Sequence, residues 1–213
     1  MVEHFTRNEG VPGSNPGVGF TGDAATHPRI LAFEKSQTSV YSRDMQLIFV
    51  VIALVFAGIH LARHRAQIHG SGAVAEVFLR YWLGIAIGLG AILGALAFFA
   101  DGAQIAKQIC FTRGDGGFEL ENAMGDLAIG VGAFLCLWIR DTKYWLAVIV
   151  ISSVLLLGDA YGHIHQLVVH DNHCSGNVGV TLYFDILGPL VAIILYALMR
   201  RGKRSQEPPA ATS

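Results

Sequence analysis

Five long apolar stretches constrain this chain more than any other feature of its sequence. A bilayer core about 30 Å thick needs roughly 20 apolar residues per crossing, and only helices or closed barrels leave no backbone group unpaired there. None of the stretches alternates strictly, as a membrane β-strand does. We therefore predict an all-α integral membrane bundle of five transmembrane helices. The stretches run approximately from Met45 to Ala62, Val77 to Phe99, Leu120 to Ile139, Tyr144 to Val169 and Val178 to Met199.

The composition supports a membrane protein over a soluble helical bundle. Hydrophobic residues make up 53% of the chain and charged residues only 15%, with a mean hydropathy of +0.48. A soluble bundle would need charged outer faces, which these segments lack. The net charge of −1 also argues against a nucleic-acid partner, since such binding normally shows as a basic patch. We expect the lipid bilayer to be the partner and the cytoplasmic membrane to be the location of this multi-pass protein.

Basic residues predict the orientation of the bundle. With five crossings, three basic clusters fall on one side, and the opposite loops carry only Lys107 and Arg113. Because basic loops stay in the cytoplasm, we predict a cytoplasmic C-terminus and an N-terminus outside. The clusters comprise Arg63 and Arg65, then Arg140 and Lys143, and finally Arg200, Arg201, Lys203 and Arg204.

The chain divides into three predicted parts. Residues 1–44 are polar and rich in Gly and Pro, residues 45–200 form the transmembrane domain, and residues 201–213 form a basic and polar cytoplasmic tail. The first part is expected to be disordered. Alternatively, it is a mis-annotated extension, because the peptide from Gly13 to Gly17 matches the translation of a transfer-RNA T-arm, and Met45 then begins the protein.

Small residues on the second helix allow close helix packing. Glycines four residues apart let backbones approach in lipid, where no hydrophobic force drives association. Packing within the bundle is the favoured use, and a homo-oligomer face is the alternative. The glycines concerned are Gly84, Gly88, Gly90 and Gly94.

Ionisable residues inside the helices are the most informative about function, because placing such groups in lipid costs free energy. Asp126, Asp159 and Asp185 belong to three different helices. Counted from the basic ends at about 1.5 Å per residue, all three lie at roughly the same level, about 21 to 24 Å away. By the same count, Glu121 and His163 form a second polar layer near the outer edge of the hydrocarbon.

Helical spacing brings some of these groups together. Asp159, His163 and Gln166 share one stripe of their helix. Glu121 and Asp126, five residues apart, point roughly 140° away from each other, so both cannot face one small site. We predict an outward-facing polar pocket drawn from Glu121, Asn122, Asp126, Asp159, His163, Gln166 and Asp185.

Three motifs resemble an uncharacterised family of small prokaryotic multi-pass membrane proteins. The resemblance spans roughly Arg80 to Tyr196 and implies the membrane topology without supplying a reaction. In the family a Glu corresponds to Glu121, an Asn to Asp126, and Gly-Asp-x-x-Gly-His to residues 158–163. The motifs are Phe118-Glu-Leu-Glu-Asn-Ala-Met-Gly-Asp-Leu-Ala-Ile-Gly130, then Leu157-Gly-Asp-Ala-Tyr-Gly-His163, then Asn177-Val-Gly179 with Asp185.

Three uses of the pocket remain open at this point. Its groups can hold helices together, carry protons, or bind a divalent metal as cofactor, since carboxylate with imidazole suits zinc, manganese or iron. The loop after the fourth helix adds soft ligands, and Cys174 can instead form a disulfide with Cys110. The candidate metal ligands are Asp159, His163, His170, His173 and Cys174.

No catalytic motif appears in the sequence, which argues against an enzyme. A membrane enzyme would use Asp159 and His163 as base and orienting group. An ion-coupled or proton-coupled transporter would need a polar path to the cytoplasm, and the inner halves of the helices are apolar. The sequence therefore favours a one-sided pocket with a structural, sensing, or metal- or proton-binding role.

Overall fold

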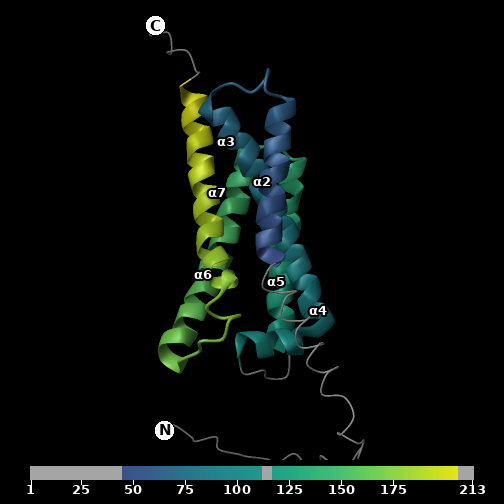
Figure 1. The fold of residues 1–213 in the computed structure, drawn as a ribbon, viewed down its shortest axis with the longest axis vertical. Helices are drawn as coiled ribbons and strands as arrows, with labels where there is room; N and C mark the ends of the chain where they lie inside the picture. The colour runs from purple at the N-terminus through teal and green to yellow at the C-terminus, as the bar shows by residue number, and fades with distance from the viewer. Residues whose placement is uncertain (1–44, 112–116, 206–213) are drawn as a thin grey trace, which may run out of the picture.

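The computed structural model describes residues 45–111 and 117–205, and this part of the chain is helical without strands. The predictions made for residues 1–44 and for the tail beyond Ser205 lie outside the described residues. The elements are α2 (Met45–Arg63), α3 (Gly70–Tyr81), the π-helix η1 (Trp82–Leu89), α4 (Gly90–Ile109), α5 (Gly117–Phe134), the 3-10 helix η2 (Leu135–Leu137), α6 (Thr142–His170) and α7 (Val180–Arg204) (Figure 1).

Five helices in the described ranges are long and apolar enough to cross a membrane, which confirms the predicted all-helical bundle of five spans. The second span is longer than expected. It joins α3, η1 and α4 into 40 residues from Gly70 to Ile109, whereas the apolar stretch covers only Val77 to Phe99. The additional residues are polar at both ends, so hydropathy could not assign them to a helix.

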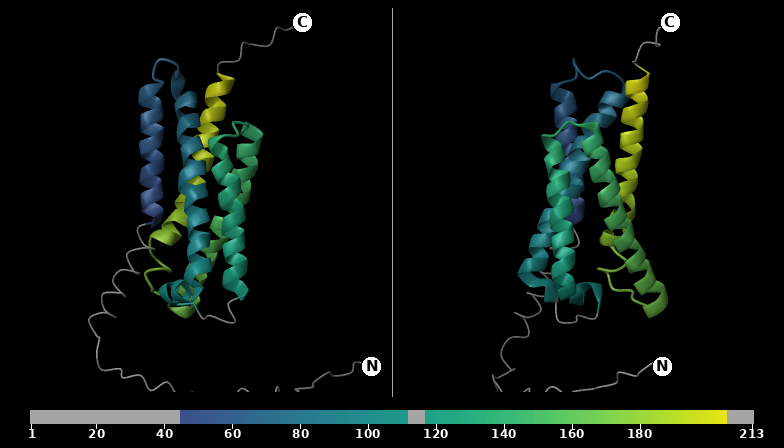
Figure 2. Two further views of the ribbon diagram at one scale, coloured as in Figure 1. Left: turned by 90° about the vertical axis from the view of Figure 1, so that its right-hand side faces the viewer. Right: turned by 180° about the vertical axis from the view of Figure 1, so that it is seen from behind.

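Asp101 marks where the apolar part of α4 ends. Its backbone leaves the helical region, with φ −155° and ψ 66°, and its Oδ1 accepts a hydrogen bond from the backbone N–H of Gln104 at 3.0 Å. This is the geometry of an N-cap, so a new helical turn starts at this residue. The last residues of α4 consequently turn across the end of the bundle (Figures 1 and 2).

The bundle has two distinct ends (Figure 1). We call the end with the α2–α3 connection and the last turn of α7 the C-terminal end. At the other end, the disulfide end, the last turns of α4 meet the loop after α6. A disulfide joins Cys110 to Cys174 there, with their Cα atoms 6.0 Å apart. These are the two cysteines that the sequence analysis paired.

Large apolar side chains fill the part of the bundle nearer the C-terminal end. They are at most 2% exposed and include Leu79, Leu83, Ile87, Trp145 and Met199. The indole Nε1 of the buried Trp82 donates to the carbonyl of Gly188 at 3.0 Å, beside Pro189. Outside this core, the helices present many exposed apolar side chains, as expected of surfaces that face lipid.

Glycines bring η1 and α5 into close contact. A Cβ atom on Gly88 would lie 2.5 Å from the backbone nitrogen of Phe134, and one on Gly130 would lie 2.7 Å from that of Ile92. Gly84 packs in the same way against Leu137. At Gly84 and Gly88 the structure therefore shows packing within the bundle. A Cβ on Gly94 would have no neighbour within 4 Å.

Candidate functional site

The loop after α6 positions the site at the disulfide end. The α6 helix ends at His170. The next residue, Asp171, caps it with a φ of 52° that turns the chain, and the N–H of Asn172 donates back to the carbonyl of Gln166 at 3.2 Å. The side-chain amide of Asn172 donates to the carbonyl of Ile109 at 2.9 Å, while its Oδ1 accepts from the N–H of Cys174 at 3.1 Å. Asn172 and the disulfide thus fasten the loop to α4.

Asn177 extends this network to His163. Its side chain is fully buried, and its Nδ2 donates to the carbonyls of His163 at 3.1 Å and of Asn172 at 2.9 Å. Both amide hydrogens are therefore used, so the remaining Oδ1 accepts. Its partner at 2.8 Å is Nδ1 of His163, which must carry a hydrogen in this arrangement. This assignment follows from the hydrogen-bond network, as histidine tautomers generally must.

The other ring nitrogen of His163 faces Asp185. Nε2 lies 3.7 Å from Oδ2 of Asp185, and the two side chains are only 11% and 5% exposed. That Oδ2 is buried and has no hydrogen-bond partner in the described part of the chain. Since Nδ1 already carries a hydrogen, a single further proton between Nε2 and Oδ2 would satisfy both atoms. It would form either a neutral pair or an ion pair.

Asp126 on α5 and Asp159 on α6 lie near this pair. Asp185 feels the charges of both residues, Asp126 feels that of Asp159, and Asp159 is attracted by His163. The structure thus brings the three aspartates, predicted to share one level, within electrostatic range of each other. Three close carboxylates in lipid require compensation by protons, by His163 or by a cation.

The remaining residues of the predicted pocket take no part in this pair. Glu121 is exposed on α5, because it points away from Asp126 as its spacing requires. Asn122 and Gln166 are half-buried, and in the described chain neither side chain hydrogen-bonds to His163 or Asp185. The site therefore narrows to His163 and Asp185, with Asp126 and Asp159 around them.

The five candidate metal ligands do not converge. Cys174 is oxidised to a disulfide and offers no thiolate, and His173 pairs with Asp171 at 2.9 Å in the solvent. The ring of His170 packs against that of His165, with centroids 5.8 Å apart. Among the described residues, no group of three or more His, Cys, Asp or Glu side chains could hold a metal ion. The expected metal set of Asp159, His163, His170, His173 and Cys174 is therefore not assembled.

Asn172 and Asn177 were absent from the predicted pocket, although they set the orientation of His163. Polar loop residues are usually only solvated, so composition could not single them out. The available signal was the place of Asn177 just before the last helix, in the motif Asn177-Val-Gly179, which is one of those that carry the family resemblance. Its burial depends on the loop folding back under α6, which is a tertiary property.

The fold defines an all-helical protein whose five longest helices suit a membrane. The family model described as "Family of unknown function (DUF6790)" matches residues 43–205, and the chain belongs to this family. The predicted resemblance to an uncharacterised family is confirmed at this level. No curated protein and no solved structure matches the chain.

Proposed function

We propose that this protein is a proton-responsive protein of the cytoplasmic membrane, in which the His163–Asp185 pair binds and releases a proton. The observation that carries the proposal is the pairing of His163 Nδ1 with Asn177 at 2.8 Å. This bond directs the other ring nitrogen, Nε2, towards the buried and unpartnered Oδ2 of Asp185. Histidine is the side chain best suited to respond near neutral pH.

The distribution of charge supports access from outside. The basic residues gather at the C-terminal end, which the positive-inside rule assigns to the cytoplasm. The pair would then lie in the outer half of the membrane, beneath the loop that carries Asn172 and Asn177. A proton arriving there would change the charge shared by His163, Asp185, Asp126 and Asp159.

Sensing fits this site better than proton transport through a single chain. On the cytoplasmic side of the aspartates, the space between the helices is filled by Leu83, Ile87 and Trp145, all at most 2% exposed. A proton path would need a ladder of polar groups there. The network instead links the pair through Asn177 and Asn172 to the end of α4. Protonation can therefore alter how α4, α6 and α7 are held together.

Nitrogen NMR of the wild-type chain in lipid nanodiscs, with labelled histidine rings, tests the proposal without any substitution. Between about pH 5 and pH 8, one histidine should keep a protonated Nδ1 while its Nε2 changes state. Infrared difference spectra over the same range should show a carboxyl band that disappears in Asp185→Asn. If the buried histidine stays neutral throughout and the infrared spectrum is unchanged in Asp185→Asn, the His163–Asp185 pair has only a structural role.

The chain offers a matched control for this measurement. His173 and Asp171 form a second His–Asp pair at 2.9 Å, but their side chains are 69% and 92% exposed. Asp171→Asn removes the same charge from the same end of the bundle and should leave the carboxyl band intact. If both substitutions abolish the band equally, the signal does not come from the buried pair.

A further inference from the structure

A second group of titratable side chains lies at the opposite end of the bundle. His60 and His64 on α2, Arg80 on α3 and Arg140 in the α5–α6 turn form what we call the basic cluster. The rings of His60 and His64 are 4.8 Å apart, and Nδ1 of His60 is hydrogen-bonded to the hydroxyl of Tyr81 at 3.0 Å. His60 also feels the charges of Arg80 and Arg140.

Arg80 is held in place by the last residue of η2. Its Nε donates to the carbonyl of Leu137 at 2.9 Å, and one terminal nitrogen donates to the same oxygen. The guanidinium carbon lies 5.7 Å from the centre of the Tyr81 ring. A guanidinium has five N–H donors, so the unused ones remain available to a ligand. Arg80 is thereby fixed next to the turn that carries Arg140.

The basic cluster has no counter-ion in the described part of the chain. Glu76 at this end pairs with Lys203 at 2.9 Å, and the carboxylate of Asp141 accepts from the backbone N–H groups of Lys143 and Tyr144. Arg80 and Arg140 repel one another, and neither has a carboxylate partner among the described residues. A fixed Arg80 beside the exposed Arg140, without an acid between them, forms a suitable site for a phosphate group.

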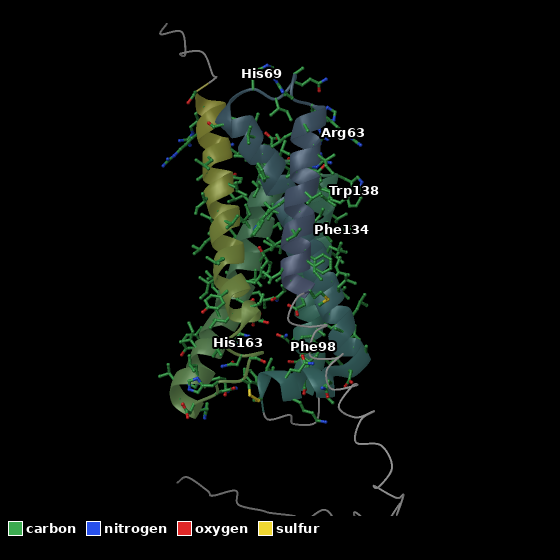
Figure 3. The ribbon with its side chains drawn as sticks, viewed as in Figure 1. Arg63, His69, Phe98, Phe134, Trp138 and His163 are labelled. Carbon is green, nitrogen blue, oxygen red and sulfur yellow. A yellow bond between two sulfur atoms is a disulfide. The ribbon has the colours of Figure 1, made fainter. Side chains whose placement is uncertain are left out.

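The surroundings of the basic cluster are those of a membrane interface. Trp138, two residues before Arg140, is 62% exposed, and Figure 3 shows it near the C-terminal end. Phe56 and Ile59, on the same helix as His60, are exposed at 49% and 43%. Exposed tryptophan typically lies at headgroup level, and apolar side chains just below it contact acyl chains.

We propose that the basic cluster binds the phosphate of an anionic phospholipid, with the acyl chains lying against α2. Arg80 and Arg140 supply the charge, His60 and His64 supply further donors, and Phe56 and Ile59 supply the apolar contact. Basic pockets between transmembrane helices on the cytoplasmic side are known to suit such head groups. This proposal is independent of the proton site, which lies at the other end of the bundle.

The test measures lipid carried by the full chain purified from membranes, and then binding of labelled phosphatidylglycerol or phosphatidylcholine in detergent micelles. Wild type should prefer phosphatidylglycerol. Arg140→Gln should lower that preference about five-fold, the factor that matches about 1 kcal/mol for one basic residue at an anionic surface. Arg204→Gln, which removes the same charge at the tip of α7, should retain it. Arg140→Lys should largely retain it as well.

Every other outcome decides against the proposal. Equal binding of both lipids by wild type shows that the basic cluster does not select an anion. Equal losses of the phosphatidylglycerol preference in Arg140→Gln and Arg204→Gln show only a general attraction of anionic lipid to the basic end. Displacement of phosphatidylglycerol by millimolar inorganic phosphate assigns the site to a soluble anion. Should Arg140→Gln not fold, His64→Gln in the same assay gives the same comparison.

Discussion

The two halves of the bundle hold their helices together by different means. Nearer the C-terminal end, η1 meets α5 at Gly88 and Gly130 and meets η2 at Gly84, and large apolar side chains fill the remaining space. At the disulfide end, the contacts are a covalent bridge, two buried asparagines and a buried His–Asp pair. Lipid provides no hydrophobic force between helices, so close packing and polar bonding are the available alternatives. The half held by polar bonds is also the half in which we propose that a proton is bound.

Removing the disulfide should have the largest effect on the disulfide end. The double substitution Cys110→Ser with Cys174→Ser opens a link between residues 64 apart, which is worth about 4 kcal/mol in the chain-entropy account. Thermal unfolding in detergent measures the loss. Reductant should destabilise wild type to the same extent and leave the double variant unchanged. An effect of reductant on the double variant would point to a different target.

In the half nearer the C-terminal end, Gly88→Ala should be the most destabilising addition of a single methyl group. The new Cβ would lie 2.5 Å from the backbone nitrogen of Phe134, so η1 and α5 must separate, at a cost of about 2 to 3 kcal/mol.

Gly94→Ala is the matched control, because its Cβ has no neighbour within 4 Å and alanine favours a helix by up to about 1 kcal/mol. The two variants should therefore shift the unfolding temperature in opposite directions. If Gly94→Ala instead changes the oligomeric state, Gly90 and Gly94 form the homo-oligomer face that the sequence left open.

Asn177→Ala should cost about 2 kcal/mol, because it removes the acceptor of Nδ1 of His163 and the side-chain donor to two backbone carbonyls. The histidine could then rotate or change tautomer, so the NMR signature of a fixed Nδ1–H should also disappear. Asn122→Ala removes a half-buried amide that is not bonded to the pair, and it should preserve that signature. Loss of the signature in both variants would show that Asn177 has no special role in orienting His163.

The smallest expected effect concerns Asp141, at the start of α6. Hydrogen bonds from the backbone N–H groups of Lys143 and Tyr144 lower the pKa of this exposed carboxyl group. Its contribution to stability is therefore present above the ordinary carboxyl pKa and is lost as the pH falls through the lowered one. Asp141→Asn should flatten the acid side of the stability profile slightly, whereas Asp171→Asn should not. An unchanged profile in Asp141→Asn would contradict the capping role.

Several features of this protein followed from the sequence alone. The length and hydropathy of the five stretches predicted the number of helices that can span a membrane, because each stretch is about as long and as apolar as a helix that crosses the hydrocarbon core. Helical rise predicts a common level for Asp126, Asp159 and Asp185, and helical spacing predicts that Glu121 and Asp126 point apart. These are properties of single helices, which local sequence controls.

Only the tertiary structure decided how these helices and loops meet. The break at Asp101 and the π-helix from Trp82 to Leu89 were visible only in the structure. The burial of Asn177 arises from contacts between segments apart in the sequence, since its amide donates to the carbonyls of His163 and Asn172. The tertiary structure also decided that Asp185 is the partner of His163. Hydropathy could not predict this pair, because it does not depend on which face of α6 or α7 points towards the other helix. Sequence thus predicted which groups belong to which helix, while packing and loop hydrogen bonds determined which of them face each other.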